Sequence, residues 1–265
     1  MLFFQLNTWL LAIILLAILA AATLIGLSLG RAARKKSEDL REAFSVIQGT
    51  LLGFMGLVLA FGLSLAIGRY ETRREAVVNE ANAIGTTYLR AETIAEPQRS
   101  QSLALLKRFT DTSITISGEI PGSSAESKKI AASGLIQRQL WGLAGLSLQH
   151  APSDAAPRLY VESLNDMFDA QSTRTASLAN RVPTPVLALE IVGAALALAA
   201  LALHMATLGG RGVFTVLIAA LLVWVILLVT FDLDRPTRGL IRVPMTPLLQ
   251  ERAAMELPPA ATPTR

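Results

Sequence analysis

The chain has 265 residues, of which 52% are hydrophobic and 17% are charged. This composition is too apolar for a soluble domain of that length and predicts a membrane protein. The net charge of +4 does not indicate nucleic-acid binding, because the basic residues flank apolar segments, where they set the orientation of membrane helices. The absence of cysteine excludes disulfides and cysteine metal ligands.

Four apolar segments are long enough to cross a bilayer as α-helices, which need about 20 residues for a hydrocarbon core of about 30 Å. They cover residues 9–29, 46–67, 185–206 and 213–231. The first segment could also be a signal peptide with an A-x-A site at Ala20 and Ala22. An uncleaved anchor is favoured, because residues 1–8 carry no positive charge.

The expected fold is an all-α membrane protein with four transmembrane helices and a helical bundle inserted between spans two and three. Its regions are residues 1–67 with spans one and two and a basic loop at 30–45, the soluble bundle at 68–184, spans three and four at 185–231, and an extramembrane tail at 232–265.

The basic loop carries Arg31, Arg34, Lys35, Lys36 and Arg41. The positive-inside rule therefore places this loop in the cytoplasm and the N-terminus, the bundle and the C-terminus outside. Two further groups oppose this orientation, because they lie just past spans two and four: Arg69, Arg73 and Arg74, and Arg235, Arg238 and Arg242.

The start of the soluble region predicts one long helix that continues the second span. An apolar stripe recurs at steps of four and three, made of Val77, Ala81, Ile84, Tyr88 and Ala91. The same steps reach Arg74 and Tyr70 upstream, in register with the end of the span.

Three more helices are expected, separated by breaks at Pro97, GEIPGSS and HAPSDAAP. The second begins at Ser123, with Glu126 completing a capping box, and the third covers residues 157–181. Their apolar stripes are Leu106, Phe109 and Ile116, then Ile136, Leu140, Leu143 and Ser147, then Tyr160, Leu164, Met167 and Gln171. The ITI that ends the first stripe could also be extended. Four such helices would pack as an antiparallel bundle.

The second span carries a row of small residues, namely Gly49, Gly53, Gly56, Ala60, Ser64 and Gly68. Small residues let another helix approach closely in lipid, where van der Waals packing drives association. This face either packs against another helix or lines a pore.

Two ionisable residues lie in the third span. Glu190, five residues after Pro185, is close enough to the interface to snorkel. His204, near the other end, either sits at the headgroups or acts as a pH-sensitive group. Neither has a charged partner deep in the span, which disfavours a proton-coupled transporter and is compatible with an apolar pore constriction.

The end of the fourth span is rich in charge. Asp232 and Asp234 could bind a cation such as Ca²⁺, but two carboxylates provide too few oxygen ligands. A salt bridge to Arg73 or Arg74 is the favoured interpretation.

Patterns typical of enzymes are missing from the sequence. Its two histidines, His150 and His204, accompany no nucleophile, and GxSxG, GxGxxG and Walker patterns are absent. We therefore expect no catalysis, no cofactor and no metal.

RYETRREAVV (69–78), EANAIGTTYLRA (80–91) and FDLDRPTRGLIRV (231–243) together resemble a bacterial membrane family of unknown function called bestrophin-like, over roughly residues 40–250. The positions that represent these motifs are Arg69, Glu80, Asn82, Tyr88, Asp232, Asp234, Arg235 and Pro236. The resemblance implies a multi-pass protein of the bacterial inner membrane.

The resemblance also implies a link to bestrophins, which are oligomeric anion channels with one pore-lining helix per subunit, here the second span. RPTRGLIRV lacks the acidic cluster of their Ca²⁺ clasp, and Phe54 and Phe61 are the only aromatic residues of the second span. Calcium gating is therefore not expected. The cytosolic soluble part of bestrophins also conflicts with a bundle outside the cell.

Two functions follow. The first is a homo-oligomeric channel for a small ion in the lipid bilayer. The alternative is a non-catalytic, membrane-anchored sensing or binding protein, or an envelope scaffold.

Overall fold

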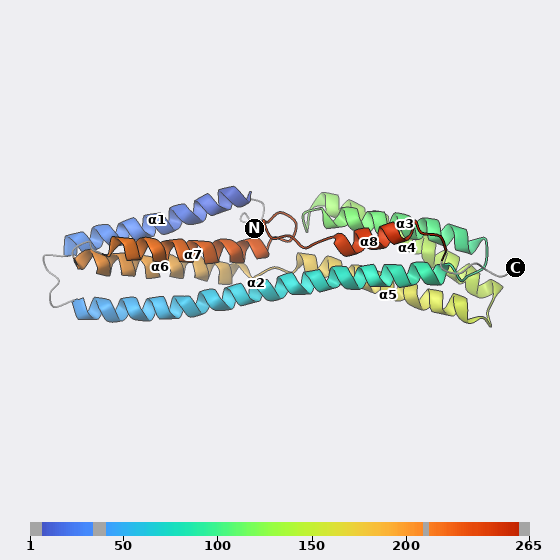
Figure 1. Ribbon diagram of the computed structural model, residues 1–265, viewed down its shortest axis with the longest axis horizontal. Helices are drawn as coiled ribbons and strands as arrows, with labels where there is room; N and C mark the ends of the chain where they lie inside the picture. Colours follow the sequence, from blue (N-terminus) through green and yellow to red (C-terminus); the bar gives the residue numbers. More distant parts are fainter. Residues whose placement is uncertain (1–6, 34–40, 209–211, 260–265) are drawn as a thin grey trace. The chain divides into compact units, whose positions relative to one another are not determined.

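Helices make up all the regular structure in residues 7–33, 41–208 and 212–259, which the computed structural model describes. In chain order they are α1 (Thr8–Ala33), α2 (Arg41–Ala91), α3 (Gln98–Ser117), α4 (Ser124–His150), α5 (Ala155–Ala179), α6 (Thr184–Thr207), α7 (Val213–Leu233) and α8 (Thr246–Ala254) (Figure 1). Residues 34–40 of the predicted basic loop lie outside the described ranges.

The chain forms two compact units. Unit 1 contains Met1–Tyr70 and Arg181–Arg242, and unit 2 contains Glu71–Asn180 and Val243–Arg265.

Four helices are long and apolar enough to cross a membrane. They are α1, α2, α6 and α7, so the expected all-α fold with four spanning helices is confirmed. A helix suits this role because it satisfies every backbone hydrogen bond within its own segment, where lipid offers no partner.

In unit 1, α1 and α6 approach so closely that two glycines are required. A Cβ at Gly26 would overlap the backbone of Ala199, and one at Gly30 would overlap that of Leu203. Figure 1 shows α6 beside both α1 and α7. The apolar core between these helices includes Leu15, Leu198 and Leu227.

The predicted long helix is confirmed, because α2 runs unbroken through 51 residues. That length is far more than the ~20 residues needed to cross a bilayer. Its C-terminal part belongs to unit 2, where Val77, Ala81, Ile84 and Ala91 are buried and Tyr88 is half-buried.

The helical spacing extended this stripe upstream to Arg74, but the arginine that is buried is Arg73. Arg74 is exposed and pairs with Glu71 at 3.1 Å, whereas Arg73 is buried. The Arg73 guanidinium donates hydrogen bonds to the carbonyl oxygens of Ser177 and Asn180, at 3.3 and 2.6 Å. These carbonyls lie at the C-terminus of α5, where unpaired acceptors and the helix dipole both favour a cation.

Unit 2 packs the C-terminal part of α2 with α3, α4 and α5. The predicted stripes face its core, with Leu106, Phe109, Leu140, Tyr160 and Leu164 inaccessible to solvent. The ITI segment, at residues 114–116, is helical and lies in the last turn of α3, which ends at Ser117. Its Ile116 is buried in the core. The segment is therefore helical, as the stripe predicted, and not extended.

A short C-terminal helix, α8, completes unit 2 and was not expected from the sequence. The Tyr88 hydroxyl donates to the carbonyl oxygen of Met255 at 3.1 Å, and Lys107 pairs with Glu256 at 3.1 Å. The Glu251 carboxylate lies over Gly85 of α2, where a Cβ would clash with it. Burial in this contact raises the pKa of Glu251.

The predicted cap of α4 is present with one change. The Ser123 hydroxyl accepts the N–H of Glu126 at 3.1 Å, as expected. The Glu126 carboxylate, however, accepts the N–H of Gly122 at 2.6 Å instead of that of Ser123. Gly122 has φ of +83°, a conformation that favours glycine.

We predict that Ser123→Ala lowers the free energy of unfolding by about 1 kcal/mol, because the first turn of α4 loses its side-chain acceptor. Denaturant unfolding of the full chain in detergent, followed by circular dichroism, measures the change. The control is Ser124→Ala, which removes an exposed hydroxyl next to the cap. Equal effects of the two substitutions would contradict the capping role.

Candidate functional site

The small-residue face of α2 points away from the rest of its own chain. A Cβ added at Gly49, Gly53, Gly56 or Gly68 would meet no described atom within 4 Å, and Ala60 and Ser64 are exposed. The side of α2 that packs within unit 1 carries Met55, Leu59, Gly62 and Ala66, all of them buried. Among the described residues, therefore, the small-residue face forms no packing seam within this chain.

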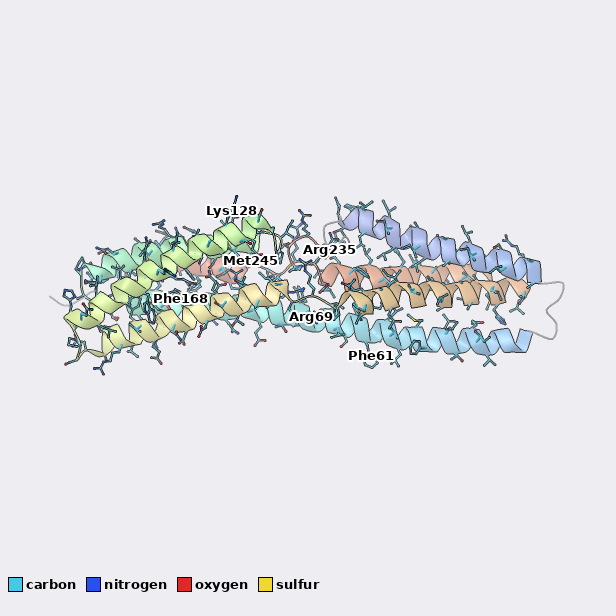
Figure 2. The ribbon with its side chains drawn as sticks, turned by 180° about the vertical axis from the view of Figure 1, so that it is seen from behind. Phe61, Arg69, Lys128, Phe168, Arg235 and Met245 are labelled. Atoms are coloured by element: carbon cyan, nitrogen blue, oxygen red, sulfur yellow. The ribbon has the colours of Figure 1, made fainter. Side chains whose placement is uncertain are left out.

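The two aromatic residues of the second span lie on the outward side as well. Phe54 is 54% exposed and Phe61 is 63% exposed. Figure 2 shows Phe61 on the side of α2 that faces away from the neighbouring helices of unit 1. The outward half of the helix thus alternates small residues with large apolar ones, including Leu57.

Glu190 of α6 is the most unusual polar residue of unit 1. Its side chain has no solvent exposure, and neither carboxylate oxygen has a hydrogen-bond partner in the described part of the chain. The Glu190 side chain runs across to α2, and the expectation that it snorkels to the interface stays a prediction. Its carboxylate lies over Gly62, where a Cβ would overlap it.

A second glycine contact lies nearby on the same two helices. The Met55 side chain of α2 covers Gly193 of α6. Each helix therefore places a long side chain over a glycine of the other. Ionisable residues within membrane helices are rare and usually have a partner or a function, so an unpartnered carboxyl at this contact is a candidate for a functional group.

His204 is half-buried and lies 14 positions beyond Glu190 on α6. At ~1.5 Å per residue the two groups are about 21 Å apart, so they do not form a pair. The Nδ1 atom of His204 is enclosed and has no hydrogen-bond partner among the described residues.

The aspartates of the FDLDRPTRGLIRV segment close the end of α7 by accepting backbone hydrogen bonds. Asp232 accepts the N–H groups of Leu240 and Ile241 at 2.9 and 2.8 Å. Asp234 accepts the N–H of Val182 at 3.0 Å. These bonds give the motif a structural role in unit 1.

The same motif brings the start of α1 to the end of α7. Arg235 donates a hydrogen bond to the Thr8 hydroxyl at 3.4 Å. The next residue in the chain, Pro236, is buried. Among described residues, no group of three or more His, Cys, Asp or Glu side chains could hold a metal ion. The salt bridge expected from Asp232 or Asp234 to Arg73 or Arg74 stays a prediction.

The motif residues of α2 differ in how far they are buried. Arg69 is half-buried and Asn82 is exposed. Glu80 is completely buried in unit 2, where it forms an ion pair with Arg174 of α5. The Ser113 hydroxyl donates to Glu80 at 2.8 Å, and Arg174 also donates to Ser117.

This ion pair continues into a polar network inside the bundle. The Gln171 side chain donates to Ser113 at 2.7 Å and accepts from Ser133 at 2.9 Å and Gln137 at 2.8 Å. Sequence reasoning missed Arg174. The signal was available, because the α5 stripe that ends at Gln171 reaches Arg174 after three more residues.

The four apolar helices and the second helical unit define an all-helical membrane protein. A model of the Bestrophin-like domain matches residues 12–248, and the chain belongs to this bestrophin-like family. The resemblance inferred from the sequence is thereby confirmed. No curated protein matches the chain.

Solved structures of bacterial bestrophin homologues share this fold. One variant of the homologue from Klebsiella pneumoniae has a TM-score of 0.70 and 14% identity, and covers 95% of this chain and 96% of that chain. A second variant has a TM-score of 0.67 and 14% identity, with 88% and 96% covered. A third has a TM-score of 0.62 and 16% identity, with 90% and 95% covered.

We predict that Arg174→Met destabilises the protein by about 3–5 kcal/mol, because it leaves the Glu80 carboxylate buried without its counter-ion. Adding Glu80→Met should restore much of this loss, since two apolar side chains can replace a buried ion pair. Denaturant unfolding in detergent measures both changes.

The matched control is Arg74→Met, which removes an ion pair whose two side chains are each 55% exposed. Its effect should stay within about 0.5 kcal/mol, as is usual for surface pairs. A loss for Arg174→Met as small as that of the control would contradict the role of the buried pair.

Proposed function

We propose that this chain is one subunit of a homo-oligomeric ion channel and that α2 lines its pathway. The observation that carries the proposal is the outward small-residue face of α2, which no part of its own chain covers among the described residues. Membership of the bestrophin-like family supports it through the implied link to bestrophins, which are anion channels rather than enzymes. The proposed cargo is a small anion, and no catalytic step is assigned.

The proposed pathway uses two properties of α2. Gly53, Gly56 and Ala60 allow α2 helices from neighbouring subunits to approach closely, because lipid-embedded helices associate by van der Waals packing. Phe54, Leu57 and Phe61 would then form an apolar constriction. Such a constriction controls ion flow by admitting or excluding water.

The proposed location is the bacterial inner membrane, with lipid as the partner of the exposed faces of α1, α6 and α7. The N-terminus, the unit 2 bundle and the C-terminus are proposed to lie outside, on the strength of the basic loop at residues 30–45.

Ligand binding by unit 2 is the second candidate function. It is favoured by a cavity of about 430 Å³ where α2 and α4 end and α3 and α5 begin. Gln98 and Ser147 line this cavity. Small-molecule sites usually occupy about 300–1,000 Å³. A binding module predicts that the pure protein passes no ions and co-purifies with a ligand or a partner protein.

We predict that Gly56→Leu and Ala60→Leu each lower chloride flux from proteoliposomes by about tenfold or more, because the larger side chains disrupt the close approach of neighbouring α2 helices that forms the constriction. The control is Ala20→Leu, which makes the same change as Ala60→Leu at an exposed position of α1. Flux should survive in the control. An absence of flux in the pure wild-type protein would contradict the channel.

A second experiment tests the proposed orientation. Single cysteines replace Ser37, Ser124 and Thr262, one at a time, in a chain that has none of its own, and intact cells are treated with an impermeant maleimide. We expect labelling at Ser124→Cys and Thr262→Cys but not at Ser37→Cys. The reverse pattern would place the bundle in the cytosol.

A further inference from the structure

Glu190 lies where α2 and α6 of unit 1 meet. The contact consists of side chains laid over glycines, with Glu190 over Gly62 and Met55 over Gly193. By contrast, α1 and α6 meet backbone to backbone at Gly26. Any change in the Glu190 side chain therefore acts directly on the contact that holds α2 to its neighbour.

The helices around Glu190 bring no charge to it. No ionisable residue occurs in 8–30 of α1, 45–68 of α2 or 213–231 of α7. The first charged residues along these helices are Arg69, two turns beyond Gly62, and Asp232, at the end of α7. Asp232 is hydrogen-bonded to backbone N–H groups, and no described side chain bonds to the Glu190 oxygens.

The ligand that fits this carboxyl is a proton. A metal cation needs several oxygen ligands, whereas a proton needs only one carboxylate oxygen. The described residues around Glu190 are apolar or glycine on the facing surface of α2, including Leu59 and Ala66. They offer no second oxygen ligand from a side chain.

We propose that Glu190 is a proton-binding site that controls the packing of α2 against α6. With the proton bound, the neutral carboxyl fits the apolar space beside Gly62. When the O–H bond breaks and the proton passes to water, the remaining carboxylate draws water into the contact, because an unpaired charge is not stable in an apolar site.

The consequence for ion flow rests on the proposed channel function. The face of α2 opposite Gly62 is the one assigned to the pathway. A displacement of α2 on deprotonation would therefore change the constriction at Phe61 and make flux depend on pH.

Thiol accessibility tests the site without relying on flux. Ala66 lies one helical turn from Gly62 on the same buried side of α2 and has no solvent exposure. Ala66→Cys in the full chain is reacted with a small methanethiosulfonate reagent in liposomes at pH values between about 5 and 9. The same cysteine in a Glu190→Gln chain provides the reference, because it shares the pH dependence of the thiol itself.

We expect the ratio of the two labelling rates to rise steeply with pH, up to about tenfold per unit below the midpoint. The infrared spectrum at acid pH should also show a protonated carboxyl band that Glu190→Gln lacks. A ratio that stays flat across the range would overturn the proposal, and so would identical infrared spectra of the two chains.

Gly62→Ala keeps the test valid if Glu190→Gln alters folding. Its added methyl group displaces the Glu190 carboxyl, so Ala66→Cys should react at every pH in this background. Protection of the cysteine by Gly62→Ala would count against the contact. A pH-dependent ratio without any flux would refute the channel and leave the proton site standing, whereas flux with a flat ratio would do the reverse.

Discussion

The free energy required to bury polar groups constrains both units of this protein. In unit 2 the buried Glu80 carboxylate is stabilised by Arg174 and Ser113. In unit 1 Asp232 accepts two backbone N–H groups at the end of α7. Breaking a pair of the first kind is costly, because the remaining charge keeps its desolvation penalty. Glu190 differs from these buried carboxylates, since neither of its oxygens has a hydrogen-bond partner among the described residues. An unpartnered buried polar group calls for an explanation, and at a helix contact that explanation can be a function.

Glycine serves two opposite purposes in the membrane helices. Gly26, Gly30 and Gly62 are covered by neighbouring atoms, and a methyl group at any of them would clash. Gly53 and Gly56 meet nothing within their own chain. The first group closes contacts inside the subunit, and the second is available to a second copy. Both follow from the same physics, because helices in lipid associate through close van der Waals contact.

The two sides of α2 give the proposals a common basis. One side, with Met55 and Gly62, holds the helix against α6. The other side carries Phe54, Phe61 and the small residues, and is open. A helix fixed on one side through a titratable group and exposed on the other is suited to couple protonation to a change in a pathway. The long course of α2 into unit 2 adds a second anchor, through the buried Arg73 and Glu80.

Composition and periodicity were enough to predict the four apolar helices, the continuous α2, the core stripes of the bundle and the Ser123 cap. These features depend on residues close together in the chain, through helical spacing and local hydrogen bonds. Family membership followed in the same way from short motifs. The sequence could not decide which face of α2 is covered, that Arg73 rather than Arg74 is buried, or that Glu190 crosses to Gly62. Those outcomes depend on which helices become neighbours, because burial and hydrogen-bond partners are supplied by residues far apart in the chain.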